Sequence, residues 1–142
     1  MMKDVLVKVK TVQTDDQGES DTIELTAEGK FAEKNGSYLI KYSDAFISGA
    51  NDPIFTTVKV SSDGSVSVTR SGSYQSRFVI EKQKRCNCLY QTPYGTMSMG
   101  FYGEKIENNL NKKGGKLSLW YTVDINGSEL NRNQMIISIK EV

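Results

Sequence analysis

The sequence predicts an all-β protein that folds as a single antiparallel up-and-down barrel of about 8–10 strands. Apolar residues recur with a period of two along most of the chain, whereas the 3.6-residue period of an amphipathic helix is almost absent. Short turn sequences rich in Gly, Asn and Asp separate the alternating runs. The chain of 142 residues shows no linker or repeat, so we expect residues 1–142 to form one domain.

The inward-facing positions of the predicted strands can be followed from one run to the next, because the residues between them are mostly polar. In the first half they are Val5, Val7, Val9, then Ile23, Leu25, Ala27, then Tyr38, Ile40, Tyr42, then Val58, Val60, and Val66, Val68. In the second half they are Phe78, Ile80, then Cys86, Cys88, Tyr90, then Met97, Met99, Phe101, then Leu117, Leu119, Tyr121, Val123, and Met135, Ile137, Ile139. Residues 104–112 fit either a helical turn or a strand, and we interpret them as a strand.

Turn residues between these runs indicate that neighbouring strands are antiparallel. Asp15–Gly18 predicts a longer connection after the first strand, and Ser43–Pro53 is the longest predicted loop. Tight hairpins are expected at four dipeptides: Asn35-Gly36, Asp63-Gly64, Gly114-Gly115 and Asn126-Gly127. About ten antiparallel strands in one small domain favour a closed sheet, because an open one would expose two edges and an apolar face.

Composition narrows the function classes. The sequence has 18 basic and 17 acidic residues, two cysteines and no uninterrupted hydrophobic run longer than three residues, as at Val5–Val7. We therefore expect a cytoplasmic protein without a signal peptide or a membrane helix. The absence of histidine disfavours Ser-His-Asp and Cys-His catalysis and His-ligated metals. We accordingly predict that the protein is not an enzyme and has no cofactor or metal site.

Three stretches resemble a known family. They are TTVKVSSDGSVSVTRSG at residues 56–72, YQTPYGTMSMGF at residues 90–101, and GGKLSLWYTVDINGSELNRNQMIISI at residues 114–139. They are similar to the YwiB-like family of small bacterial β-barrel proteins of unknown function. The resemblance implies a calycin-like, lipocalin-related barrel, and it implies no activity and no binding residues.

Arg70 is the strongest candidate for a functional residue. It shares the inward phase of Val66 and Val68, which places a guanidinium in an apolar interior, where it needs hydrogen-bond acceptors. One interpretation is an anchor for the anionic group of a ligand, with the hydroxyl of Tyr90 or Tyr121 beside it. The other is a structural plug that closes the barrel by bonding to carbonyl groups or stacking on a ring. Both interpretations stay open from the sequence.

Met97 and Met99 add deformable side chains to the predicted interior, which favours a cavity, although methionine also fills gaps in packed cores. We read Cys86 and Cys88 as small buried side chains rather than metal ligands. The predicted function is non-enzymatic binding of a small, partly apolar, anionic ligand inside the barrel. The predicted ligand-binding residues are Arg70, Tyr90, Tyr121, Met97 and Met99.

An alternative function follows from the distribution of charge. Residues 1–69 carry 7 basic and 11 acidic side chains, a net charge of −4, and residues 70–116 carry 9 basic and 3 acidic, a net charge of +6. Arg77, Lys82, Lys84 and Arg85 could form a basic patch on the outside of a filled barrel that binds a protein or RNA partner or another copy of the chain. The chain contains no recognised nucleic-acid-binding motif, which disfavours a nucleic-acid partner. We expect no membrane partner. The sequence leaves open whether the protein forms a homodimer.

Overall fold

The computed structural model describes residues 2–43, 55–71, 76–92, 95–125 and 128–142. These residues form ten strands, and no helix occurs among them. The strands are β1 (Lys3–Asp15), β2 (Ser20–Lys34), β3 (Ser37–Ser43), β4 (Phe55–Val60), β5 (Val66–Ser71), β6 (Ser76–Ile80), β7 (Arg85–Thr92), β8 (Gly95–Asn111), β9 (Gly114–Ile125) and β10 (Ser128–Glu141). Every run of alternating residues in the sequence lies in one of these strands, which confirms the all-β prediction.

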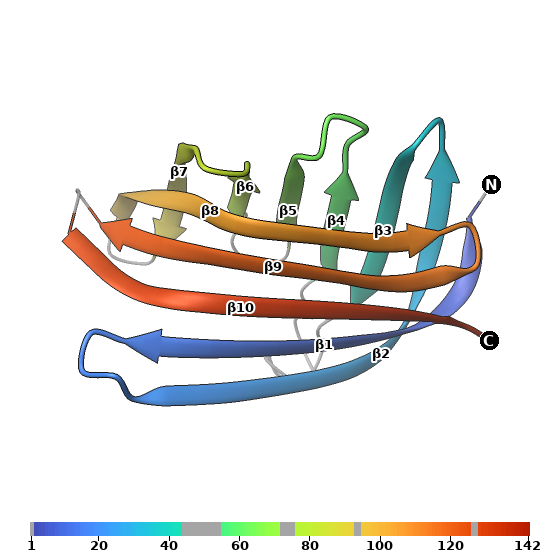
Figure 1. Cartoon of the computed structure of the whole chain (residues 1–142), viewed down its shortest axis with the longest axis horizontal. Helices are drawn as coiled ribbons and strands as arrows, with labels where there is room; N and C mark the ends of the chain where they lie inside the picture. The colour runs from blue at the N-terminus through green and yellow to red at the C-terminus, as the bar shows by residue number, and fades with distance from the viewer. Residues whose placement is uncertain (1, 44–54, 72–75, 93–94, 126–127) are drawn as a thin grey trace.

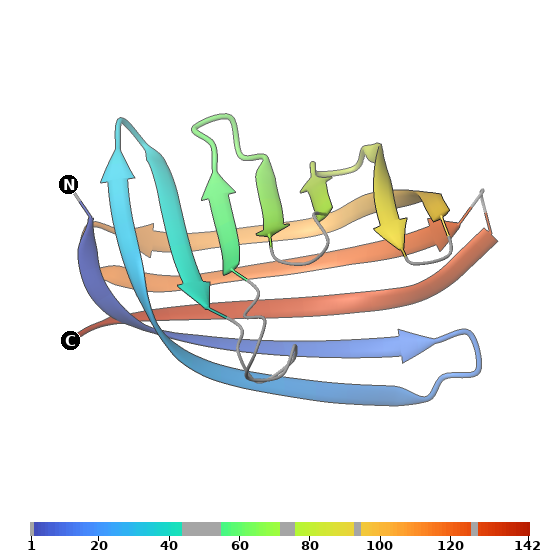
Figure 2. The ribbon, with the colours of Figure 1, turned by 180° about the vertical axis from the view of Figure 1, so that it is seen from behind.

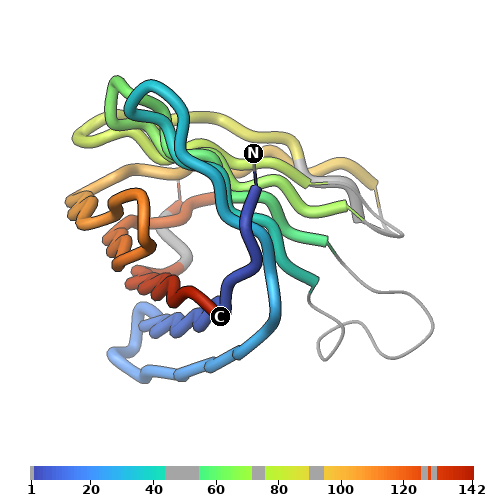
Figure 3. Tube along the Cα trace, turned by 90° about the vertical axis from the view of Figure 1, so that its right-hand side faces the viewer, coloured from blue at the N-terminus to red at the C-terminus, as the bar shows by residue number. Residues whose placement is uncertain are grey.

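Each strand pairs antiparallel with the next one along the chain, and β1 pairs with β10 to close the sheet. The closing ladder runs from the Val5–Glu141 pair to the Asp15–Asn131 pair, so it extends over most of both strands. The two chain ends consequently lie close together (Figure 3). The topology is a closed up-and-down barrel, as the sequence predicts, and it is consistent with the calycin-like architecture that the family resemblance implies.

The barrel is flattened into two layers of different strand length. The long strands β1, β2, β8, β9 and β10 run across the front of Figure 1, and the shorter strands β3 to β7 cross behind them at a steep angle. The view from behind shows the short strands in front of the long ones (Figure 2). β2 curves from one layer into the other. It pairs with β1 of the long-strand layer up to Phe31 and with β3 of the short-strand layer from Gly29 onward.

Two predicted hairpin turns are confirmed. Asn35-Gly36 joins β2 to β3 with a positive φ at both residues (53° and 82°), and Gly64 has a φ of 96° in the turn between β4 and β5. Asp15–Gly18 leads from β1 into the β1–β2 connection as expected. Asn126-Gly127 and residues 44–53 of the longest predicted loop lie outside the described residues.

The tight hairpin predicted at Gly114-Gly115 forms, and both glycines have the expected positive φ (131° and 115°), but its turn lies immediately before them. The turn between β8 and β9 is formed by Lys112 and Lys113, and Gly114 already pairs with Asn111 in the sheet. A side chain at Gly114 would place its Cβ 2.5 Å from the carbonyl oxygen of Ile139. The glycine is therefore needed for a close approach between strands. Residues 104–111 continue β8, as interpreted from the sequence, after an irregularity in register between Gly103 and Lys105.

Large apolar side chains fill one end of the barrel, where β1, β3, β5, β7 and β9 begin. We call it the packed end. Its fully buried side chains come from strands all around the ring and include Val5, Val7, Phe31, Ile40, Val58, Val60, Val66, Ile80, Leu117, Leu119 and Ile137. Burying one such side chain away from water stabilises the fold by about 1.5–3 kcal/mol. The packed end is thus the main hydrophobic core of the protein.

Tyr38 links the two layers at the packed end. Its hydroxyl donates a hydrogen bond of 3.0 Å to the backbone carbonyl of Leu110 on β8, and its ring stacks on Phe31 with 6.0 Å between centroids. A partly buried tyrosine hydroxyl needs such a partner. This contact therefore joins β3 to the end of β8 across the interior.

β6 and β7 form the shortest ladder in the described part of the barrel, with a single residue pair, Ser76–Tyr90. The turn between them bends onto β8 instead. The backbone N–H of Gln83 donates a 2.6 Å hydrogen bond to the carbonyl of Gly103, and a Cβ at Gly103 would lie 2.4 Å from the carbonyl oxygen of Glu81. The β6–β7 corner is therefore held to the barrel through β8.

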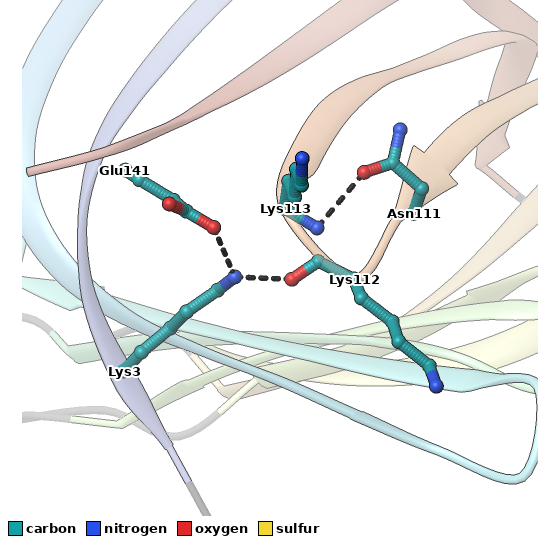
Figure 4. A network of polar contacts seen from close by, with 5 residues as sticks. All are labelled: Lys3, Asn111, Lys112, Lys113 and Glu141. Carbon is teal, nitrogen blue, oxygen red and sulfur yellow. Dashed lines mark hydrogen bonds and ion pairs between the residues drawn. The ribbon is translucent and has the colours of Figure 1, made fainter.

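A polar contact joins both chain ends to the β8–β9 turn at the packed end. Lys3 Nζ donates to Glu141 Oε1 at 2.6 Å and also to the carbonyl oxygen of Lys112, while Asn111 Oδ1 accepts from the N–H of Lys113 at 2.8 Å (Figure 4). The ammonium group of Lys3 lowers the pKa of Glu141 below its ordinary value through a hydrogen bond and through charge. A carboxylate with a lowered pKa stabilises the fold only while it is ionised.

Glu141→Gln should therefore reduce the free energy of unfolding at neutral pH and leave it unchanged in strong acid. The contribution of Glu141 is complete above its unfolded-state pKa, about 4.3, and is lost as the pH falls through its lower folded-state pKa. Urea denaturation of both proteins at a series of pH values measures the difference. Glu24→Gln, which removes an exposed carboxylate, is the control. A gap between wild type and Glu141→Gln that persists at the lowest pH would contradict this assignment.

Gly29 lies where β2 passes between the layers, and a Cβ there would lie 2.4 Å from the carbonyl oxygen of Lys41 and 2.8 Å from Cγ2 of Val7. Backbone and packed core atoms cannot easily move away, so Gly29→Ala should destabilise the barrel by about 1–3 kcal/mol. Thr26→Ala on the same strand is exposed and should change stability by less than about 0.5 kcal/mol. Equal denaturant midpoints for the two variants would show that the bend tolerates a side chain.

Candidate ligand-binding cavity

A cavity of about 410 Å³ lies at the opposite end of the barrel, where β1, β3, β5, β7 and β9 stop. We call it the cavity end. The cavity is lined by side chains from the ends of β1, β3, β5 and β9 and from the first parts of β2, β6, β8 and β10. Its size falls within the range of ordinary small-molecule pockets, about 300–1,000 Å³. The interior of the barrel is thus packed at one end and hollow at the other.

Arg70, the next-to-last residue of β5, lines this cavity. The strand places it in the same inward phase as Val66 and Val68, as the sequence predicts, and pairs it with Thr56 on β4. Arg70 Nε and Thr56 Oγ1 are both buried and have no hydrogen-bond partner among the described residues. Burying a polar group without a partner costs about 1–3 kcal/mol in proteins. The two unpaired groups therefore lower the free energy of unfolding of the ligand-free protein.

Arg70 carries the only formal charge among the described residues that line the cavity. No hydrogen bond or ion pair joins it to another described residue, so the part of the chain that the structure describes offers no acceptor of the kind that a structural plug requires. A guanidinium has five donors arranged to hold a carboxylate or phosphate by two parallel hydrogen bonds. The cavity therefore contains a guanidinium with no hydrogen bond or ion pair to a described residue.

Aromatic side chains form one apolar wall. Phe78 of β6 and Phe101 of β8 stack with centroids 4.5 Å apart, and the ring of Tyr121 on β9 is tilted against both at 5.9 and 6.1 Å. All three are at least 95% buried. Met99 and Met135 extend this wall with flexible thioether side chains. The wall is suited to the apolar part of a ligand.

A polar wall faces Arg70 from the other side of the barrel. Asn131 and Asn133 of β10 line the cavity, and Asn133 Nδ2 donates a 2.6 Å hydrogen bond to Asn131 Oδ1. Asn131 is only 8% exposed. Thr11 and Gln13 of β1 line the same side. Sequence reasoning missed this wall because it followed the inward phase of β10 only from Met135 onward. Extending that phase backward by two and four residues would have found both amides.

The predicted ligand-binding residues divide into three groups. Arg70, Tyr121 and Met99 lie together around the cavity. Met97 is partly exposed near the start of β8 and is not one of the described lining residues. Tyr90 belongs to β7, but its side chain lies outside the part of the structure that is described.

The four predicted outer basic residues are exposed, but two of them are paired with acidic groups. Arg85 crosses the face of Gly100 and binds Asp124 through two hydrogen bonds of 2.9 and 2.6 Å, which raises the pKa of Arg85. Lys84 forms an ion pair with Glu81 at 3.3 Å. An outer anionic partner would therefore depend mainly on Arg77 and Lys82, which take part in no ion pair with a described residue.

Both cysteines are free thiols. Cys88 is buried, and partial burial raises the pKa of Cys86 above its ordinary value, which keeps that thiol protonated and weakly nucleophilic at neutral pH. Within the described ranges, no three His, Cys, Asp or Glu side chains come together as metal ligands. The described part of the chain likewise has no helix with the length and hydropathy to span a bilayer.

The fold and the cavity together define an up-and-down antiparallel β-barrel with an internal site at one end. A family model described as "Domain of unknown function (DUF1934)" matches residues 7–137, so this chain belongs to that family. The crystal structure of the ywiB protein from Bacillus subtilis is similar to it, with a TM-score of 0.85 and 22% identity over 99% of this chain and 93% of the other. No curated protein matches the sequence. The comparisons confirm the family resemblance and the fold.

The free state of Arg70 can be tested by stability measurements. Arg70→Met keeps an apolar stem but removes the partly buried charge and its unpaired Nε, so the free energy of unfolding should stay the same or rise by up to about 1–3 kcal/mol. Arg85→Met is the control and should lower stability, because it removes the two hydrogen bonds that Arg85 donates to Asp124. Denaturant unfolding of the ligand-free proteins measures both. A loss of stability in Arg70→Met as large as that in Arg85→Met would instead identify Arg70 as a structural plug.

Proposed function

We propose that this protein is a non-enzymatic, cytoplasmic binding protein that holds a small, partly apolar ligand with one anionic group in the cavity. The observation that carries the proposal is Arg70, a partly buried cation in a cavity of otherwise neutral side chains, whose buried Nε has no hydrogen-bond partner among the described residues. A charge withdrawn from water without compensation destabilises a protein. A ligand anion would supply the missing hydrogen bonds and would remove that cost on binding.

The chemistry of the lining supports a carboxylate rather than a multiply charged group. One guanidinium balances one negative charge, and its two parallel N–H donors match the two oxygens of a carboxylate. The hydroxyl of Thr56, buried beside Arg70 in the ladder, is a second polar group that lacks a partner. A phosphate monoester, with a charge near −2 at neutral pH, would leave negative charge uncompensated in this cavity.

The remaining lining favours an apolar body on the ligand. Phe78, Phe101, Met99 and Met135 present rings and thioethers to the cavity, and burial of apolar surface contributes about 25 cal/mol per Å². Neutral side chains around one cation are suited to recognition rather than to proton transfer, which supports a non-enzymatic role. The two free thiols are in keeping with a reducing compartment.

Decanoate tests this proposal, because it combines a single carboxylate with an apolar chain. Arg70→Gln should weaken decanoate binding about ten- to a hundredfold, the range expected for loss of hydrogen bonds to a charged group. Arg77→Gln is the matched control. Arg77 lies on β6 opposite Thr69, the residue before Arg70 on β5, but its side chain is exposed. Titration calorimetry of the three proteins below the micelle concentration measures the affinities.

Decanol, which lacks the charge, provides a second comparison. It should bind the wild type more weakly than decanoate and should be insensitive to Arg70→Gln. Failure of decanoate to bind, or equal losses in the Arg70 and Arg77 variants, would overturn the proposal.

A further inference from the structure

The polar wall of the cavity is not explained by an apolar ligand with one acidic end. Asn131 and Asn133 place two amide side chains at the cavity end, and Asn131 is more than nine-tenths buried. An amide that is withdrawn from water costs free energy unless its donors and acceptors are satisfied. A plain hydrocarbon tail against this wall would leave those groups unpaired.

The two amides satisfy each other only in part. Asn133 Nδ2 donates to Asn131 Oδ1 at 2.6 Å, and no other side-chain hydrogen bond joins either amide to a described residue. A primary amide has two donors and one acceptor oxygen. The pair therefore retains N–H donors on Asn131 and a carbonyl acceptor on Asn133. A group that both donates and accepts, such as a hydroxyl or an amide, complements this combination.

The topology places this pair opposite the anion-binding group. In the closed order of the barrel, β5 and β10 are separated by four strands on either side, so Arg70 and the amide pair lie on facing walls. The apolar side chains of Phe101, Val123 and Met135 also line the cavity. A ligand that reaches from one wall to the other must be polar at both ends and apolar between them.

We propose that the ligand is a carboxylic acid with a second, neutral hydrogen-bonding group at its far end, bound by Asn131 and Asn133. Hydroxy acids and amide-bearing acids with an apolar middle belong to this class, and unsubstituted fatty acids of the same length bind more weakly. The inference rests on the proposed function, because Arg70 holds the acid end. It adds that the amide pair determines which acids bind.

The test compares ω-hydroxydecanoate with decanoate, which differ only in the terminal hydroxyl. The wild type should prefer the hydroxy acid about three- to tenfold, the gain expected from a net hydrogen bond to a neutral group. Asn131→Leu and Asn133→Leu keep the approximate side-chain size but remove the polar groups, and each should abolish this preference. Two separate variants are used so that loss of folding in one leaves the other informative.

Gln134→Leu is the matched control. Gln134 lies between Asn133 and Met135 on β10, so its side chain points to the outer face, where it pairs with Trp120 on β9. This variant should keep the wild-type preference for the hydroxy acid. Calorimetric titration gives the affinities, and circular dichroism confirms that each variant is folded.

The outcomes separate the two proposals. Equal or weaker binding of the hydroxy acid by the wild type, or a preference that survives in the asparagine variants, overturns the role of the amide pair but leaves Arg70 as the anchor. Failure of both acids to bind, or binding that ignores Arg70→Gln, removes the anchor and the amide role together. A preference that disappears in Asn133→Leu and persists in Gln134→Leu supports the inference.

Discussion

The ladder between β1 and β10 is the constraint on which the rest of the structure depends, because it joins the two ends of the chain and closes the sheet. An open sheet of ten strands would leave two edges unpaired and one apolar face in water. Closure directs the apolar phase of each strand into a common interior. It also determines which strands face each other, so that Arg70 on β5 lies opposite Asn131 on β10. The position of the cavity residues is therefore a consequence of strand order.

The two ends of the barrel contribute differently to stability. The packed end supplies buried aliphatic and aromatic surface, and the hydrogen bond from Tyr38 to Leu110 connects its two layers. The cavity end instead contains buried polar atoms without partners at Thr56 and Arg70, which are rare in native structures. A protein can tolerate such groups only when the rest of its core provides the stability that they remove. The packed end thus supports a site that is unfavourable on its own.

The strands were predictable from the sequence because period-two patterning is local, and the inward position of Arg70 follows from the same phase as Val68. The position of the turn at Lys112 and Lys113 was not predictable. Gly114 is a glycine because its backbone lies close to Ile139, and a contact between residues so distant in the chain leaves no local sequence signal. Asn131 and Asn133 continue the inward phase of Met135, but they escaped detection because polar residues at the beginning of a strand resemble a loop. The cavity itself depends on how far opposite walls stand apart, which no residue pattern encodes.

The similarity to the Bacillus subtilis protein, at 22% identity, carries over the fold and leaves the site to be judged from this chain's own residues. Positions at the packed end are constrained by volume and by close backbone approaches such as that of Gly29. We expect no such demand on Arg70, because an apolar side chain in its place would leave no buried Nε without a partner. Its nitrogen Nε is shielded from water and has no acceptor in the described chain. In the proposed function, the anionic group of a ligand in the cavity supplies the hydrogen bond that the described chain does not.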